Sequence, residues 1–249
     1  MIGIYLAYQK AVFTFDVFIG LVIYTLVMGG VYILNQLMDI DTDRINKKLF
    51  LLSSGHVTKS AAYAELAFLW ACAIIMSIRF GWLFVALIIV SIALGVAYSV
   101  PPVKLKGKPV LDTLANALGY GTVNFAIGWL LVRDYEPSMF VRFLPYVLCI
   151  AAVFINTTIV DIEGDRKAGE RTTGVFMGAA AAHVVSCLVM ASAIIVAYAR
   201  RDYVCLIPAA ISLPLFIYTA GYALWKKGVD RRATIVSFRL PGLAFTVIT

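Results

Sequence analysis

Long apolar segments constrain the fold of this chain more than any other feature. A bilayer core about 30 Å thick is crossed by a helix of roughly 20 apolar residues, and nearly every segment reaches about that length. Transmembrane strands would instead appear as alternating runs of about ten residues. The sequence predicts an all-α integral membrane protein with about eight spans: Ala11–Met38, Ser60–Phe80, Trp82–Val100, Val110–Val132, Phe140–Val160, Thr173–Ala199, Tyr203–Trp225 and Thr234–Thr249.

The composition agrees with a location in the bilayer. Charged residues make up 14% of the 249 residues, whereas a soluble domain carries about 25%, and the mean hydropathy is +0.91. The net charge of +7 does not indicate nucleic-acid binding, because the basic residues are scattered through short loops. The four cysteines lie in or beside apolar segments without metal-ligand spacing, so we expect buried, unpaired thiols.

The basic residues also predict which loops face the cytoplasm. Of the 21 lysines and arginines, 14 lie in loops after odd-numbered spans and five in loops after even-numbered spans. Positive residues accumulate on the cytoplasmic side of membrane proteins. The odd-numbered loops are therefore predicted to be cytoplasmic, and both acidic motifs described next lie on that side.

Two short acidic motifs stand where an apolar segment meets a basic loop. The first contains Asn35, Asp39 and Asp43, and the second contains Asp161 and Asp165, each at four-residue steps. Residues four apart on a helix share one face, with Cβ atoms about 5–6 Å apart. Mg²⁺ typically takes one or two carboxylates together with substrate phosphates. The motifs therefore predict a magnesium site that holds a diphosphate at the membrane surface.

Either motif alone is compatible with a solvated helix end, but their recurrence favours cation binding. A carboxylate at a helix C-terminus faces the negative end of the dipole, at a cost of about 0.3–1 kcal/mol. The pattern Asp-x-x-x-Asp-Arg, followed by a basic stretch and a glycine, occurs at Asp39–Gly55 and again at Asp161–Gly174. This similarity suggests an internal duplication of residues 11–132 and 140–249. Asp41 and Glu163 are predicted to point away from the row of motif residues on the shared helix face.

Two further groups of polar residues are candidates for substrate binding. Tyr98, Ser99 and Lys104 surround a Pro-Pro pair at the end of the third span, where the pair ends the helix. These residues fit either an aromatic belt with positive-inside lysines or a diphosphate-binding segment. In the fourth span Asp112, Asn116, Tyr120 and Asn124 follow at four-residue steps, which indicates a pocket wall or hydrogen bonds between helices.

At these residues the chain resembles the UbiA superfamily of intramembrane prenyltransferases. The matching elements occur in order over about residues 30–175: Asn35, Asp39 and Asp43; Asn46 with Ser54-Gly55; the Tyr98–Lys104 segment; and Asp161, Asp165 and Gly169. The resemblance implies a single transmembrane domain over residues 1–249, a helical bundle of usually nine spans around a central cavity that opens toward lipid. Because the first motif comes early, it also implies that the family's first span is missing here.

The resemblance also implies a reaction and assigns residues to it. Two Mg²⁺ ions, bridged by a prenyl diphosphate, would lie between the motifs on the cytoplasmic side, and the allylic cation would pass to an aromatic or lipid acceptor as diphosphate leaves. The implied metal ligands are Asn35, Asp39, Asp43, Asp161 and Asp165, and the four aspartates and Tyr98 are the implied catalytic residues. The implied substrate-binding residues are Asn35, Lys47, Ser99, Lys104 and Arg166, to which the polar row of the fourth span adds Asn116 and Asn124 as candidates.

A cation- or proton-coupled secondary transporter and an inactive family member are the alternatives. Transport sites usually lie near the bilayer midplane at broken helices. The acidic motifs instead lie at span ends beside lysines. Their position favours phosphate handling, while the acceptor stays open among aromatic acids, quinone precursors, glyceryl lipids, chlorophyllides, haem and carotenoids.

Overall fold

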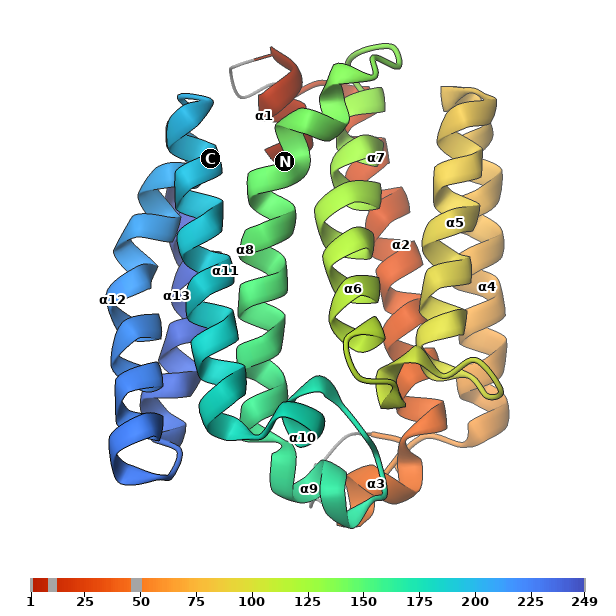
Figure 1. The fold of residues 1–249 in the computed structure, drawn as a ribbon. Coiled ribbons are helices and arrows are strands. Elements are labelled where there is room, and N and C mark those ends of the chain that lie inside the picture. The colour runs from red at the N-terminus through yellow and green to blue at the C-terminus, as the bar shows by residue number, and fades with distance from the viewer. Residues whose placement is uncertain (1, 9–12, 46–50, 249) are drawn as a thin grey trace. The chain divides into compact units, whose positions relative to one another are not determined.

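The computed structural model describes residues 2–8, 13–45 and 51–248, and this part of the chain is helical without a strand. The α-helices are α1 (Ile2–Tyr8), α2 (Phe15–Met38), α3 (Ile40–Ile45), α4 (Lys59–Ser77), α5 (Trp82–Ser99), α6 (Leu111–Leu118), α7 (Asn124–Leu130), α8 (Ser138–Val160), α9 (Ile162–Lys167), α10 (Thr173–Met177), α11 (Ala179–Ala199), α12 (Tyr203–Lys226) and α13 (Arg231–Ile248). Short 3₁₀ turns occupy Ile78–Phe80 and Leu105–Gly107, and a π-helical segment occupies Gly119–Val123. Figure 1 shows these elements in chain order.

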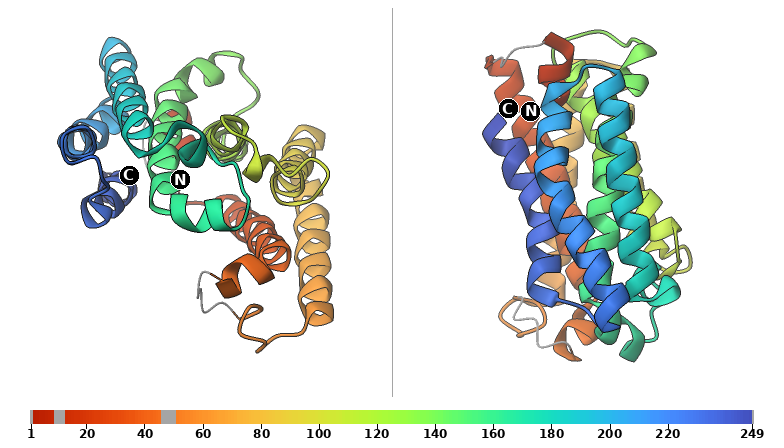
Figure 2. Two further views of the ribbon diagram at one scale, coloured as in Figure 1. Left: turned by 60° about the horizontal axis from the view of Figure 1, so that its bottom comes forward. Right: turned by 60° about the vertical axis from the view of Figure 1, so that its left-hand side comes forward.

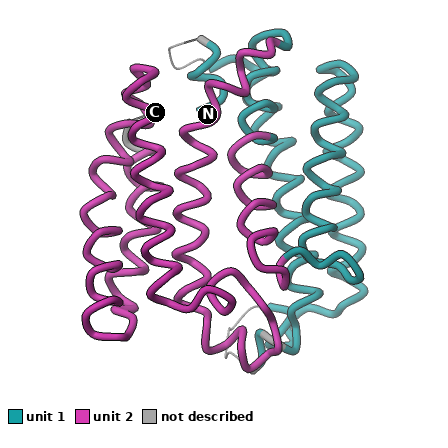
Figure 3. Tube along the Cα trace, in the orientation of Figure 1, with its two compact units in different colours: residues 1–105, 123–135 teal, residues 106–122, 136–249 magenta. Residues whose placement is uncertain are grey.

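The first of two compact units comprises residues 1–105 and 123–135 (Figure 3). Helix α2 packs against α4 and α5, and α7 packs against α1 and α5. Ile23, Val27, Phe84 and Ile88 are buried in the core of this unit. Because these helices are apolar on most faces, lipid can cover the sides that the protein does not. The unit carries the first acidic motif at the end of α2.

The second compact unit comprises residues 106–122 and 136–249. Helix α8 packs against α6, α10, α11 and α13, and α12 packs against α11 and α13, as Figures 1 and 2 show. Buried side chains also join three of these helices: Ser186 Oγ donates to Asn156 Oδ1 at 2.6 Å, and Asn156 Nδ2 donates to Ser237 Oγ at 2.9 Å. Such interhelical hydrogen bonds are typical of membrane bundles.

The chain forms an integral membrane protein, as predicted. In the described part of the chain, six helices are long and apolar enough to span a bilayer: α2, α4 with its 3₁₀ turn, α5, α8, α11 and α12. The predicted fourth span corresponds to α6 and α7, which the π-helical segment interrupts. The predicted eighth corresponds to α13, which begins earlier, at Arg231. The number of eight spans stays a prediction.

Two predicted helix boundaries are wrong. The segment Thr173–Ala199 is not one helix, because Gly178 takes a φ of 74° and separates α10 from α11. Only glycine adopts this left-handed region at low cost. The first long helix begins at Phe15 rather than near Ala11, because Thr14 caps it by accepting a hydrogen bond from Val17 N at 3.2 Å. All four cysteines have free thiols; Cys149 and Cys205 are buried as predicted, whereas Cys72 and Cys187 are only partly buried.

A glycine sets the closeness of α2 and α4. A Cβ at Gly30 would lie 2.2 Å from Trp70 Nε1, whereas a Cβ at Gly29 would lie 3.4 Å from Leu69 Cδ1. We expect Gly30→Ala to destabilise the protein by about 1–3 kcal/mol, because the indole must move. Trp70 also donates to Val27 O at 3.3 Å. Thermal unfolding in detergent, followed by tryptophan fluorescence, measures this effect; equal midpoints for Gly30→Ala and the control Gly29→Ala would contradict it.

Candidate active site

The first acidic motif lies across the joint between α2 and α3, in the first unit. Asp39 stands at the joint with φ −102° and ψ 8°. Helical hydrogen bonds nevertheless continue through it, since Asp39 N donates to Asn35 O at 3.0 Å and Asp43 N donates to Asp39 O at 2.8 Å. The four-residue spacing is therefore kept along the backbone. Asp39 and Asp43 are 6% and 5% exposed, and Asn35 is half-buried.

Apolar packing and one loop contact hold this motif in place. Leu34, Leu37 and Ile40 pack into a buried cluster with residues of α4 and the loop before it. Arg44 Nε donates to Ser53 O at 3.0 Å, which ties the loop to α3. Asp41 is exposed and lies 3.8 Å from Arg44, so its predicted orientation away from the row is confirmed. On α3, Asp43 is thus buried on one face of the helix, whereas Asp41 on another face is exposed to solvent.

The second acidic motif lies across the joint between α8 and α9, in the second unit. Asp161 stands at the joint with φ −101° and ψ 0°, and Asp165 N donates to Asp161 O at 2.8 Å. Thr172 Oγ1 donates to Asp165 Oδ2 at 2.9 Å, and Glu170 N donates to Asp165 O at 2.8 Å. Asp161 and Asp165 are half-buried, whereas Glu163 is exposed as predicted. The loop after α9 therefore folds back onto the motif.

The two joints have the same local construction. Each first aspartate follows a long helix, of 24 residues in α2 and 23 in α8, and precedes a helix of six residues. The backbone angles of Asp39 and Asp161 agree within 8°. This likeness goes beyond the sequence pattern, and the internal duplication stays a prediction that it supports.

The side chains of the motifs suit Mg²⁺. Carboxylate and amide oxygens are hard ligands, and Mg²⁺ usually takes one or two carboxylates and completes its shell with water and phosphate. Asp39 and Asp43 are almost fully buried at the negative end of a helix, and a cation bound there would offset part of the cost of burying two carboxylates. Among the described residues no three His, Cys, Asp or Glu side chains form a metal-binding group. The oxygens of each motif could supply part of an Mg²⁺ shell that water and substrate phosphate complete.

The end of α5 and the turn that follows it contain a buried hydroxyl, on Ser99, and a lysine with a positive φ angle, Lys104. Ser99 is 2% exposed, and within the described residues its Oγ has no hydrogen-bond partner. Buried polar atoms are nearly always paired, so this hydroxyl is a candidate for binding a ligand. Tyr98 beside it is half-buried. Lys104 has a φ of 33°, and its N–H donates to Val100 O at 2.9 Å in the turn after the Pro-Pro pair.

Two of the predicted cationic residues give less information. Arg166 follows the second motif directly and is exposed on α9. Lys47 lies outside the described residues. Their roles as phosphate ligands stay predictions that rest on their position after each motif.

The predicted polar row in the fourth span is divided by the π-helical segment. A π turn contains more residues than an α turn, so residues at four-residue steps do not share one helix face across Gly119–Val123. Asn116 Nδ2 donates to Asp112 O at 2.9 Å within α6, and Asn124 Nδ2 donates to the Tyr24 hydroxyl of α2 at 2.6 Å. The second bond is one of the two alternatives expected for this row, a hydrogen bond between helices. Substrate binding by these asparagines stays a prediction.

Sequence reasoning missed Thr172 and Thr173, which follow the second motif at the start of α10, with Thr172 just before the helix and Thr173 as its first residue. Thr172 bonds to Asp165, and Thr173 bonds through its N–H and hydroxyl to buried Asp112. A Thr-Thr-Gly run at the start of a helix is a capping signal, and it could have marked this segment as structured. The acceptor Asp112 could not be read from the sequence, because it lies 61 positions away.

Comparison with known proteins identifies a matching family model and relatives that match large parts of the chain. A family model described as the UbiA prenyltransferase family matches residues 1–241. Homogentisate phytyltransferase from Synechocystis sp. is 32% identical over 158 residues, which cover 56% of this chain and 48% of the relative. Digeranylgeranylglyceryl phosphate synthase from Sulfolobus acidocaldarius is 27% identical over 175 residues, which cover 70% and 62%. The chain thus spans about half the length of the first of these relatives.

Solved structures share the fold. A UbiA homolog from Archaeoglobus fulgidus bound to GPP and Mg²⁺ gives a TM-score of 0.76 at 20% identity, covering 99% of this chain and 91% of that one. The apo structure of a UbiA homolog from Aeropyrum pernix K1 gives a TM-score of 0.74 at 18% identity, covering 99% and 94%. The predicted all-helical membrane fold is therefore confirmed.

Proposed function

Since the chain belongs to the UbiA prenyltransferase family, we propose that it transfers a prenyl group from a prenyl diphosphate to a hydrophobic acceptor within the membrane, with release of diphosphate. The observation that carries this proposal is the repeated joint. Two long helices each end in an aspartate of the same backbone conformation, with a second aspartate one turn further. Oxygen ligands of this kind serve a divalent cation that neutralises a diphosphate.

Each motif contributes ligands in this proposal. Asn35, Asp39 and Asp43 would hold one Mg²⁺, and Asp161 and Asp165 would hold another. When bound, Mg²⁺ supplies positive charge that stabilises the departing diphosphate. Helix geometry fixes the ligands of each motif in advance, so little reorganisation is needed when charge develops on the leaving group.

The remaining site residues bind and orient the donor. Lys104 and Lys47 bind phosphate oxygens as point charges, and Arg166 binds them through its planar guanidinium. The Ser99 hydroxyl gains the hydrogen-bond partner that it lacks among the described residues when it donates to a phosphate oxygen. Tyr98, the next hydroxyl along α5, orients the reacting end of the donor. The allylic C–O bond then breaks, diphosphate leaves with the bonding electrons, and the acceptor attacks the allylic cation and loses a proton.

The acceptor is aromatic or lipid in this proposal. The relatives include a homogentisate phytyltransferase and a digeranylgeranylglyceryl phosphate synthase, whose names indicate an aromatic and a lipid acceptor. Asn116 and Asn124 are the polar side chains that we assign to acceptor binding. The bilayer excludes water from the reacting cation and dissolves the apolar chain of the donor.

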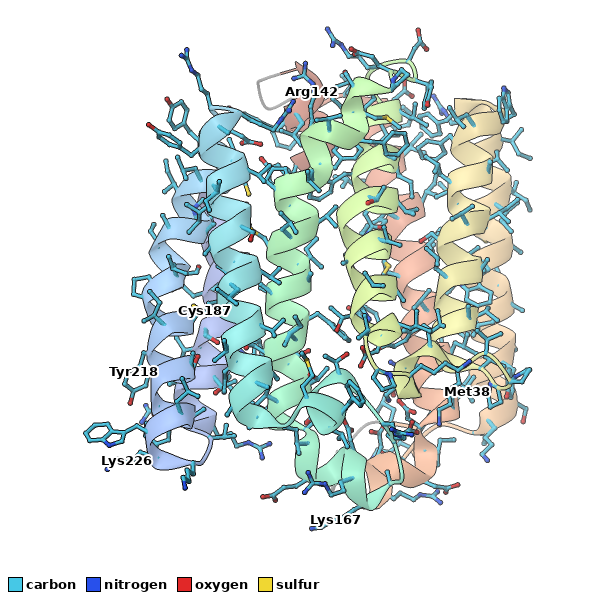
Figure 4. The ribbon with its side chains drawn as sticks, in the orientation of Figure 1. Met38, Arg142, Lys167, Cys187, Tyr218 and Lys226 are labelled. Atoms are coloured by element: carbon cyan, nitrogen blue, oxygen red, sulfur yellow. The ribbon has the colours of Figure 1, made fainter. Side chains whose placement is uncertain are left out.

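The site faces the cytoplasm in this proposal. Within the second unit, Lys167 and Lys226 lie at one end of the helices and Arg142 lies at the other, as Figure 4 shows. Seven of the 13 lysines and arginines of this unit lie in or beside the segments that follow α8 and α12, and these segments lie at the same end as the second motif. The positive-inside rule assigns that end to the cytoplasm.

A release assay tests the function. Protein purified in detergent receives a radiolabelled prenyl diphosphate with Mg²⁺, with or without EDTA, and a panel of aromatic and lipid acceptors. We expect diphosphate release and prenylated product only with Mg²⁺. If the assay shows no Mg²⁺-dependent release of diphosphate, and the protein transports the substrate across the membrane of liposomes, a transporter would be favoured instead.

A further inference from the structure

We propose that Asp112 is a positioning residue that holds the second acidic motif and the lysine-rich segment before α6 in one arrangement for diphosphate binding. This inference rests on the proposed function and adds a residue that touches neither metal nor substrate. All the contacts that carry it lie within the second unit.

Asp112 is a buried carboxylate that accepts hydrogen bonds from α10. Asp112 is 1% exposed. Its Oδ2 accepts from Thr173 N at 2.7 Å, and its Oδ1 accepts from Thr113 N at 2.6 Å and from the Thr173 hydroxyl. Val110 N donates to Thr173 Oγ1 at 2.9 Å. The first turns of α6 and α10 are therefore joined through one carboxylate and one threonine.

Thr173 is adjacent in the chain to a residue that binds the second motif. Thr172, the preceding residue, donates its hydroxyl to Asp165 Oδ2 at 2.9 Å. Asp112 and Asp165 thus bind adjacent residues of one segment. Because hydrogen bonds to a carboxylate oxygen direct its remaining lone pairs, the placement of Thr172 affects where Asp165 presents its oxygens. Asp112 acts on Asp165 through the segment Thr172–Thr173.

The same contact positions basic residues relative to the motif. Lys106 and Lys108 precede Asp112 by six and four residues. Between them, a Cβ on Gly107 would lie 2.5 Å from Glu170 Oε2, so the backbone of the lysine-rich segment lies against the loop after α9. Lys106 and Lys108 would therefore keep a fixed position relative to a phosphate bound beside Asp165. Losing Asp112 would release both sides of this arrangement.

A purely structural role makes a different prediction, and Asp202 provides the matched control. Asp202 also accepts from a backbone N–H (Cys205 N, 3.1 Å) and from a hydroxyl (Tyr146, 2.9 Å) in the same unit. It precedes α12, and the 21 residues of α11 separate it from α10, a length of about 31 Å. If Asp112 only stabilises the fold, Asp112→Asn and Asp202→Asn should change the same properties.

The experiment measures binding of Mg²⁺ with inorganic diphosphate to the purified full chain, together with steady-state transfer. We expect Asp112→Asn to weaken diphosphate binding and to raise the KM for prenyl diphosphate by about tenfold, which corresponds to about 1.4 kcal/mol. Loss of folded protein alone lowers the maximal rate in proportion and leaves the KM unchanged. Asp202→Asn is expected to lower the unfolding midpoint without changing either constant.

A pair of threonine variants decides the question if Asp112→Asn does not fold. Thr173→Val removes the hydroxyl bond to Asp112, and Thr173→Ser keeps it. We expect weaker diphosphate binding for Thr173→Val and recovery for Thr173→Ser. Unchanged binding constants in both Asp112→Asn and Thr173→Val would overturn the positioning role and leave the proposed function standing. A wild-type chain that binds no diphosphate with Mg²⁺ and transfers no prenyl group would overturn both.

Discussion

Replacement of Asp39 or Asp161 with alanine is expected to lower prenyl transfer by roughly a thousandfold, because each variant loses a carboxylate that would hold the Mg²⁺ whose charge stabilises the leaving diphosphate. Folding should be nearly unaffected. Both residues stand at a helix joint, and their backbone hydrogen bonds do not depend on the side chain. Removing a carboxylate from the negative end of a helix also relieves an unfavourable interaction of about 0.3–1 kcal/mol. Initial rates and unfolding midpoints of the purified variants measure the two effects separately.

Asp41→Ala and Glu163→Ala are the matched controls. Asp41 lies two residues after Asp39, on α3, and Glu163 lies two residues after Asp161, on α9. Both side chains are exposed. We expect their rates to stay within about twofold of the wild type, since exposed charges contribute little. Normal turnover in both Asp39→Ala and Asp161→Ala would refute the assignment of the two motifs to the metal.

Substitution of Gly174 by alanine is expected to displace α10 and to reduce both stability and transfer. A Cβ at this position would lie 2.6 Å from Thr158 O and 2.8 Å from Thr158 C, atoms of the α8 backbone that cannot turn aside. Over-packing of this kind costs about 1–3 kcal/mol. The displacement would also move the adjacent segment that bonds to Asp165 and Asp112. A misplacement of about 1 Å in a catalytic site can cost about a hundredfold in rate.

Gly221→Ala in α12 separates this steric effect from the general effect of removing a glycine. A Cβ at Gly221 meets nothing within 4 Å among the described residues, and alanine is about 1 kcal/mol more favourable than glycine inside a helix. We therefore expect Gly221→Ala to retain full activity and to unfold at the same or a higher temperature. Retained transfer in Gly174→Ala, with an unfolding midpoint like that of the control, would contradict the tight packing of α10 on α8.

Local features of the fold were predictable because their causes lie within a single segment. The apolar length that makes Tyr203–Lys226 a span is a property of that run alone. The four-residue spacing of Asp161 and Asp165 also survives at the joint, since the helical hydrogen bond between them is local. Boundaries were less certain where one residue decides them. Gly178 ends α10 through its backbone conformation, although the run around it is apolar on both sides.

The sequence by itself determined the class of this protein: a membrane bundle with two acidic helix ends, since run length, helical spacing and charge are written along the chain. The tertiary structure alone decided which polar residues serve one another. Asp112 meets Thr173 across 61 positions, Asn124 meets Tyr24 across 100, and Arg79 pairs with Asp16 across 63. The physical reason is that periodicity specifies the face of a helix on which a side chain lies, whereas its partner depends on which helix packs there.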